Sequence, residues 1–147
     1  MRVLLIGSGG REHALAQSLK RDPKLIKLFV APGNPGISDI AECLEIDIQN
    51  NSEIVSKSKQ LNIDLIVVGP EAPLVNGLAD ACAENQISCF GPSKSAAQLE
   101  GSKDFAKQVM KAAGVPTAES FTCTKQEEIE KALNQFGPPY VVKHDGL

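Results

Sequence analysis

The sequence has no block of basic residues, no long apolar run and no leader-like segment ahead of its first apolar run. Its net charge is −3, and because nucleic-acid-binding surfaces carry an excess of Lys and Arg, that class of function is disfavoured. A membrane-spanning helix needs about 20 apolar residues in succession, and no run approaches this length. Residues 3–6 already form an apolar strand pattern, with no signal-peptide pattern before them. We therefore expect a cytoplasmic protein that has neither nucleic-acid nor membrane partners.

Closely spaced metal ligands are also missing. No two cysteines form a C-x-x-C pair, and the two histidines, His13 and His144, lie far from the cysteines along the chain. Zinc sites and disulfide frameworks normally show such spacings. The sequence therefore predicts no metal site, and it predicts reduced, structural thiols at Cys43, Cys82, Cys89 and Cys123.

What the sequence does contain is an alternation of strand patterns and one-sided helix patterns. Short apolar runs bounded by turn residues predict buried strands, and apolar positions on one side of a helix predict covering helices. Strands are predicted over residues 3–6, 26–31, 44–48, 64–68 and 87–90, and helices over 12–20, 51–61, 76–84 and 93–100. Repeated strand–helix units imply an α/β fold in which helices cover both faces of an open parallel sheet. We assign residues 1–100 to this domain.

The remaining residues have a strand–helix rhythm of their own. A helix is predicted over 102–113, a strand over 119–123, a helix over 126–134 and a strand over 140–143. We interpret residues 101–147 as the start of a second domain. The last four residues begin a turn, which fits either a natural terminus or a fragment of a longer protein.

The turn Gly7-Ser8-Gly9-Gly10 joins the first strand to the first helix and is predicted to hold a phosphate group. Glycines let the backbone approach a ligand, and the N-terminus of a helix presents free N–H groups and a positive dipole end. A dinucleotide fingerprint fits poorly, because Glu12 stands where its third glycine belongs. Ala31-Pro32 also ends the second strand, where a ribose-binding acidic residue would stand. A small phosphate, NAD, or a tight turn without a ligand are the alternatives at this point.

Two further loops follow strands and should lie at the same edge of the sheet. The loop over residues 32–36 contains Asn34, and the loop over residues 69–74 contains Glu71. Ligands of open parallel sheets bind beyond the carboxyl ends of the strands. Glu71 could accept hydrogen bonds from sugar hydroxyls or an amine, or could be a helix-capping or surface carboxylate. Arg11 could bind a phosphate or stay solvated.

Two lysines stand out in the second domain. Lys103 begins a helix after Gly101-Ser102, and Lys143 ends an apolar run. A buried ammonium group is costly unless it is paired, and a nucleotide phosphate is one suitable partner. The alternative is that Lys143 reaches solvent at the end of its strand.

Taken together, these motifs resemble the N-terminal third of the phosphoribosylamine–glycine ligase family. The resemblance covers the whole chain in family order and is carried by residues 3–15, 30–34, 68–74, 90–92, 97–103, 114–118 and 141–147. It implies a Rossmann-like pre-ATP-grasp domain followed by the beginning of an ATP-grasp domain. The strings Gly-Gly-Arg-Glu-His and Gly-Pro-Glu-Ala-Pro favour this family over the purine-pathway carboxylases and formyl transferases that share the architecture.

The resemblance also implies an activity in de novo purine biosynthesis. Such enzymes use ATP and Mg²⁺ to activate the carboxylate of glycine as an acyl phosphate, which the amine of 5-phosphoribosylamine attacks. The products are glycinamide ribonucleotide, ADP and phosphate. We expect the Mg²⁺ ligands and most of the glycine site beyond Leu147, the 147-residue chain alone to be inactive, and the full-length protein to be a monomer.

The resemblance assigns site residues in both parts of the chain. It places Lys103 and Lys143 at the phosphates of ATP and assigns no catalytic residue. It implies that the following residues contact phosphoribosylamine: Gly9, Gly10, Asn34, Pro70, Glu71 and Ala72. Two other functions stay open, which are an NAD-dependent enzyme and a non-catalytic phosphate- or nucleotide-binding module that regulates a partner.

Overall fold

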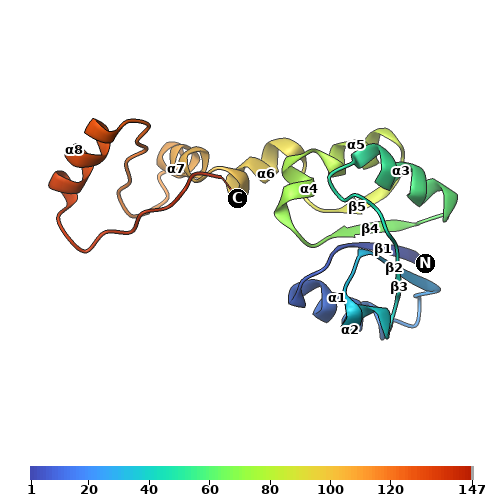
Figure 1. Ribbon diagram of the computed structural model, residues 1–147. Helices are drawn as coiled ribbons and strands as arrows, with labels where there is room; N and C mark the ends of the chain where they lie inside the picture. Colours follow the sequence, from blue (N-terminus) through green and yellow to red (C-terminus); the bar gives the residue numbers. More distant parts are fainter. Residues whose placement is uncertain (147) are drawn as a thin grey trace. The chain divides into compact units, whose positions relative to one another are not determined.

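The computed structural model describes residues 1–146, and the chain divides into two compact units, Met1–Ala97 and Gln98–Leu147. The first unit, unit 1, is built on five parallel strands in the order β3-β2-β1-β4-β5 (Figure 1). The strands are β1 (Arg2–Gly7), β2 (Lys27–Pro32), β3 (Glu42–Cys43), β4 (Leu65–Val68) and β5 (Ser88–Phe90). The central strand β1 is apolar from Val3 to Ile6 and almost inaccessible to solvent, as expected for a parallel strand covered on both faces.

Helices cover both faces of this sheet, as the alternation of patterns predicts. Successive residues of β1 point to opposite faces. Val3 and Leu5 belong to the cluster on the face of α1 (Gly10–Lys20) and α2 (Pro35–Ser38). Leu4 and Ile6 belong to the cluster on the opposite face, where Figure 1 shows the other helices of the unit. These are α3 (Asn51–Gln60), α4 (Glu71–Val75) and α5 (Leu78–Glu84). The predicted α/β fold class is confirmed.

Three details of the sequence prediction for unit 1 are wrong. The third strand lies at Glu42–Cys43 and not over 44–48, because only these residues pair with β2. The predicted loops over 32–36 and 69–74 contain the starts of the short helices α2 and α4. Their prolines prevent strand pairing but are tolerated in the first turn of a helix, where the missing N–H would have no intrahelical partner.

The second unit, unit 2, consists of helices and irregular segments over its described residues. Helix α6 (Lys94–Gly101) contains the boundary between the units, and α7 (Lys103–Ala112) and α8 (Gln126–Phe136) follow. The predicted strands over 119–123 and 140–143 are wrong, since residues 98–146 contain no strand. A strand needs a hydrogen-bonded neighbour to be stable, and none is present among these residues.

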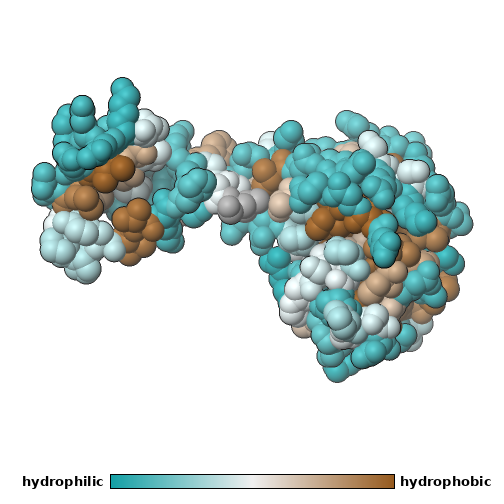
Figure 2. Space-filling view, viewed as in Figure 1, coloured by the Kyte–Doolittle hydropathy of each residue, from teal (hydrophilic) through white to brown (hydrophobic). Residues whose placement is uncertain are grey.

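Unit 2 buries little apolar surface. None of its residues up to 146 is fully buried, although the rings of Phe121 and Phe136 pack with centroids 5.0 Å apart. Val141 and Val142 are 84% and 85% exposed, and Figure 2 shows apolar side chains on the surface of this unit. No helix within residues 1–146 combines the length and the apolar character needed to cross a membrane.

Candidate functional site

The glycine turn lies between the end of β1 and the start of α1. Gly7 has φ of +128°, a conformation that glycine adopts far more readily than other residues. Gly9 is the N-cap of α1 with extended backbone angles, and Gly10 is the first helical residue. A Cβ atom added to Gly10 would meet no atom within 4 Å apart from its chain neighbours and the nearby backbone of its own helix, so there is open space beside the turn at this point.

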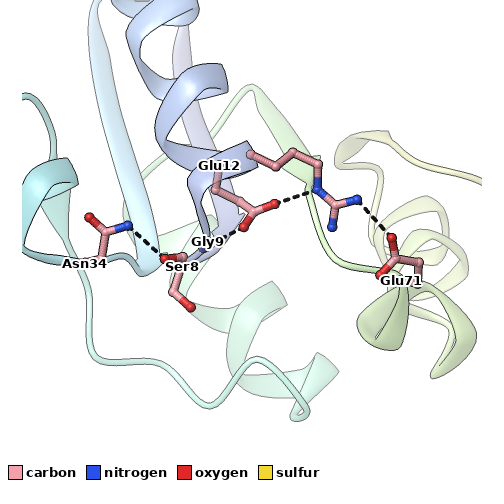
Figure 3. Close-up of polar contacts among 6 residues, drawn as sticks. Ser8, Gly9, Glu12, Asn34 and Glu71 are labelled. Atoms are coloured by element: carbon pink, nitrogen blue, oxygen red, sulfur yellow. Dashed lines mark hydrogen bonds and ion pairs between the residues drawn. The ribbon is translucent and has the colours of Figure 1, made fainter. Parts of the chain in front are cut away.

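The carboxylate of Glu12 holds this turn from inside the protein (Figure 3). Glu12 is only 4% exposed, and its Oε2 accepts a hydrogen bond of 2.7 Å from the Gly9 N–H. A Cβ atom on Gly7 or Gly69 would lie 2.5 Å and 2.3 Å, respectively, from atoms of this side chain. Glycines at the carboxyl ends of the neighbouring strands β1 and β4 therefore make room for one buried carboxylate.

Arg11 connects the glycine turn to the loop after β4. Its Nε donates to Glu12 Oε1 and its Nη1 donates to Glu71 Oε1, both at 2.9 Å. The hydrogen bond from Arg11 lowers the pKa of the Glu71 carboxyl below its ordinary value. Glu71 is therefore a paired carboxylate and not a free surface group, and Arg11 is not simply solvated.

Asn34 connects the glycine turn to the loop after β2. Its Oδ1 caps α2 by accepting from the Ile37 N–H at 2.9 Å, and its Nδ2 donates to the Ser8 carbonyl at 2.8 Å (Figure 3). Both polar atoms of one side chain are thus used to hold two loops together at the carboxyl edge of the sheet.

The structure brings the predicted site residues of unit 1 to this one edge. Pro70 is the N-cap of α4, where Glu71 is the first residue, and the half-buried Ala72 follows it. Because β1 and β4 are neighbours, these residues lie beside the glycine turn, and Arg11, which follows that turn, contacts Glu71. Sequence reasoning missed the structural roles of Arg11 and Glu12. The spacing of Glu12 three residues after the N-cap, which is typical of a capping box, could have identified one of them.

At this edge of the sheet the backbone presents a positive helix end, whereas the charged side chains are negative on balance. The first N–H groups of α1, at Gly10 and Arg11, have no acceptor in the preceding turn of the helix and lie at the positive end of its dipole. The side chains of Glu12 and Glu71 carry two negative charges against the single charge of Arg11. An anion is therefore best held by the backbone, whereas hydroxyl or amine donors are best held by the Glu71 carboxylate.

The predicted lysines of unit 2 lie on two segments that Asp145 joins. Lys103 is the first residue of α7, and its backbone N–H donates to Asp145 Oδ1 at 2.6 Å. The same carboxylate accepts from the Asp104 N–H and the Ser102 hydroxyl, and the Lys103 ammonium donates to the Gly146 carbonyl. Lys143 lies two residues before Asp145, exposed and in irregular backbone. Its predicted position at a strand end is therefore wrong, although its segment does lie beside the start of α7.

Metal-ligating side chains do not cluster in the part of the chain that the structure describes. Within residues 1–146, no group of three or more His, Cys, Asp or Glu side chains is arranged to hold a metal ion. The four cysteines form no disulfide.

Comparison with known proteins identifies similar families for both parts of the chain. The family described as "Phosphoribosylglycinamide synthetase, N domain" matches residues 1–100, and "Phosphoribosylglycinamide synthetase, ATP-grasp (A) domain" matches residues 101–147. Phosphoribosylamine–glycine ligase of Streptomyces coelicolor is 54% identical over the whole chain, which covers 35% of that protein. The chain thus spans about a third of the length of the curated relatives it matches.

Solved structures give the same picture. The crystal structure of phosphoribosylamine–glycine ligase from Thermotoga maritima matches the whole chain with a TM-score of 0.75 and 31% identity, and the chain covers 34% of it. N5-carboxyaminoimidazole synthetase from Staphylococcus aureus, complexed with ADP, matches 99% of the chain with a TM-score of 0.76, and 38% of that protein is covered. At 21% identity, this second likeness shows the fold alone.

Proposed function

The chain belongs to the phosphoribosylglycinamide synthetase family, and we propose that residues 1–100 form its N-terminal domain and residues 101–147 the beginning of its ATP-grasp domain. The ranges of the two family matches support this division. In this proposal the full-length protein is a cytoplasmic monomer that joins glycine to 5-phosphoribosylamine. ATP is consumed, and the products are glycinamide ribonucleotide, ADP and phosphate.

The glycine turn is the observation that carries the substrate assignment. Gly9 N–H is already bound by Glu12, which leaves the N–H groups of Gly10 and Arg11 to receive the 5-phosphate of phosphoribosylamine. The absence of a side chain at Gly10 lets the phosphate approach the helix end closely. The buried Glu12 carboxylate holds the turn in place through the Gly9 N–H and does not occupy the N–H groups of Gly10 and Arg11.

The ribose and amine of the substrate are assigned to the loops on either side of the turn. Asn34 holds the loop after β2 against Ser8, and Pro70, Glu71 and Ala72 form the start of α4. The paired carboxylate of Glu71 stays ionised and can accept hydrogen bonds from ribose hydroxyls or from the amine. Arg11 keeps it oriented, so we add Arg11 to the residues that shape this site.

The nucleotide is assigned to unit 2. ATP supplies the phosphoryl group that activates the glycine carboxylate, and the solved relative from Staphylococcus aureus contains ADP. Lys103 and Lys143 fit a phosphate site by charge, because ammonium groups offset the negative charge of the nucleotide phosphates. Asp145 keeps the start of α7 and the segment of Lys143 together. We expect the Mg²⁺ ligands and most of the glycine site beyond Leu147, and no step is assigned to the metal here.

Ligand titration of the ¹⁵N-labelled chain tests the substrate site. Ribose 5-phosphate serves as a stable probe that retains the phosphate and the sugar. We expect saturable shifts of the Gly9, Gly10 and Arg11 amide signals, and about a tenfold weaker affinity in Gly10→Ala, or about 1.4 kcal/mol. Ribose without phosphate is the control and should leave these signals unshifted.

Two results would count against the assignment. Equal shifts with ribose alone would remove the role of the phosphate. Shifts by NAD at the same amides, with none by ribose 5-phosphate, would favour the dinucleotide alternative.

A further inference from the structure

Asp145 and Gly146 bind Lys103 at both of its ends. The backbone N–H of Lys103 donates to Asp145 Oδ1 at 2.6 Å, and its ammonium group donates to the Gly146 carbonyl. These contacts join residues that are 42 and 43 positions apart in the sequence. The backbone and the ammonium group of Lys103 are therefore both oriented by a distant segment of the chain.

The carboxylate of Asp145 is itself held by three donors at the start of α7. Besides Lys103, the Asp104 N–H donates to Oδ1 at 3.1 Å and the Ser102 hydroxyl donates to Oδ2 at 3.0 Å. The first N–H groups of a helix have no acceptor within the helix, and Asp145 supplies the acceptor that two of them lack. Since both carboxylate oxygens are engaged, the side chain is fixed in one orientation.

Gly146 turns the chain so that its carbonyl group reaches Lys103. Its φ is +102°, in the region that glycine adopts far more readily than other residues. A Cβ atom on Gly146 would lie 4.0 Å from the Gly101 carbonyl oxygen, which is an ordinary contact. Glycine is therefore favoured at this position by the backbone conformation and not by a lack of space.

The contact of Asp145 with α7 also limits the separation of the two lysines. Lys143 precedes Asp145 by two residues, and two residues of extended chain span at most about 7 Å. Lys103 and Lys143 are both exposed and lie on segments that Asp145 joins. Two ammonium groups on neighbouring segments repel each other, and a group with several negative charges, such as the phosphates of a nucleotide, offsets that repulsion.

We propose that Asp145 is a positioning residue for ATP, which places Lys103 and Lys143 so that both ammonium groups meet the same phosphates. This inference rests on the proposed function, which assigns the nucleotide to these two lysines. Asp145 does not bind the phosphates itself, because its carboxylate is negative and already accepts from the start of α7. Its effect on ATP passes through the lysines.

Steady-state kinetics of the full-length protein test this role. In Asp145→Ala we expect the KM for ATP to rise about tenfold, since a hydrogen bond between charged groups contributes at least about that factor to affinity. The KM values for glycine and phosphoribosylamine should stay unchanged. A purely structural role would instead lower the fraction of active enzyme, which reduces kcat and leaves all three KM values as they are.

Asp145→Asn should rescue the affinity for ATP. The amide oxygen can accept from the same two N–H groups, and the NH₂ group can donate to the Ser102 hydroxyl oxygen. Its KM for ATP should lie within about threefold of the wild type. Asp22→Ala is the matched control, because Asp22 is also exposed and accepts a backbone N–H, from Lys24 at 2.8 Å. It should change none of the KM values.

A double-variant cycle determines whether Asp145 acts through Lys103. Lys103→Met should raise the KM for ATP about tenfold in the wild type and much less in Asp145→Ala, where the lysine is already displaced. Gly146→Ala keeps the carboxylate but strains the backbone that reaches Lys103, so it should raise the KM for ATP as well. This variant decides the inference if Asp145→Ala does not fold.

The possible failures can be told apart. An unchanged KM for ATP in Asp145→Ala or Gly146→Ala, or independent effects of Asp145→Ala and Lys103→Met, would overturn the positioning role and leave the lysine assignment intact. A KM for ATP in Asp145→Asn as high as in Asp145→Ala would also overturn it. If neither Lys103→Met nor Lys143→Met changes the KM for ATP, the nucleotide assignment fails, and the positioning role fails with it.

Discussion

Glu12 is the residue around which the carboxyl edge of the sheet is organised. A buried carboxylate is costly unless it is hydrogen-bonded, and Glu12 receives the Gly9 N–H and the Arg11 guanidinium. The glycines at positions 7 and 69 leave room for its volume, and Gly7 also has a positive φ that favours glycine. One side chain therefore explains why Gly occurs at the ends of two strands that are far apart in sequence.

Replacing Gly69 should destabilise unit 1 because no space is left for a methyl group. In Gly69→Ala the Cβ atom would lie 2.3 Å from Glu12 Oε1, and overpacking of this kind costs about 1–3 kcal/mol. Gly10→Ala is the matched control, since its methyl group would meet open space. It should be neutral or stabilising by up to about 1 kcal/mol.

Unfolding in urea can be followed for this comparison by alkylation of Cys82, which is fully buried in unit 1. The urea concentration at the midpoint of unfolding is compared between each variant and the wild type. Equal midpoints for Gly69→Ala and Gly10→Ala would show that the Glu12 carboxylate moves aside without cost.

The ion pair between Arg11 and Glu71 should be visible as a pH effect. The pKa of Glu71 is lowered by its hydrogen bond with Arg11, so the pair stabilises the folded state above the ordinary carboxyl pKa. This contribution is lost as the pH falls through the lowered pKa of Glu71. Both side chains are about half exposed, so the contribution should not exceed about 1 kcal/mol.

The titration of Glu71 can be measured directly by ¹³C NMR of its carboxyl carbon. Arg11→Met should raise its pKa toward the ordinary value. A Glu71 titration that is the same in the wild type and in Arg11→Met would contradict the pairing.

At the scale of elements, the starts of the short helices α2 and α4 bring Asn34 and Glu71 to the site. Asn34 caps α2 and also donates to Ser8, so Asn34→Asp keeps the cap but loses the donor. The new carboxylate would face the Ser8 carbonyl, and we expect a loss of about 1–2 kcal/mol in unfolding free energy.

Asn50→Asp is the matched control for this substitution. Asn50 caps α3 by accepting from the Glu53 N–H at 3.1 Å, a role that Asp performs equally well. Its free energy of unfolding, measured in urea, should stay within about 0.5 kcal/mol of the wild type. If both variants lose the same stability, the Asn34–Ser8 hydrogen bond contributes nothing beyond the cap.

Helix α7 is predicted to depend on Asp145. Hydrogen bonds from the Asp104 N–H and other donors at the start of α7 lower the pKa of Asp145. The contact therefore stabilises unit 2 above the ordinary aspartate pKa and weakens as the pH falls through the lowered value. The amide shifts of Lys103 and Asp104 should follow this titration, and Asp145→Asn should abolish their response. A response that persists in the variant would exclude Asp145 as the titrating partner.

At the scale of the whole molecule, the chain covers about a third of the length of its relatives. Unit 1 has a continuous apolar core on both faces of its sheet, whereas the described residues of unit 2 have no fully buried side chain. The 147 residues therefore span only part of the length that members of this family have.

We predict that the purified 147-residue chain does not turn over. With ATP, glycine and phosphoribosylamine, a coupled assay should detect no ADP release above the buffer control. Sustained ADP release that depends on both co-substrates would show that the residues described here suffice for catalysis.

Local patterns in the sequence were sufficient for much of unit 1. The apolar run of β1, the one-sided pattern of α1 and the glycines between them predict a strand, a turn and a helix, because each signal depends on residues close together in the chain. The family also followed from motifs in the sequence, since they occur in order over the whole chain. The predictions of strands over 119–123 and 140–143 were wrong, because strand formation depends on a hydrogen-bonded partner that local patterns do not contain.

The contacts of the candidate site were decided only by the tertiary structure. Arg11 meets Glu71 across 60 residues, and Asn34 meets Ser8 across 26. Glu12 appeared in the sequence as a departure from a dinucleotide fingerprint, and only the neighbouring ends of β1 and β4 show that it fills the space which Gly7 and Gly69 leave open. The sequence determined most of the strands and longer helices of unit 1, through short-range hydrophobic and turn preferences. Which side chains meet was decided by the order of the strands in the sheet, because that order brings distant loops to one edge.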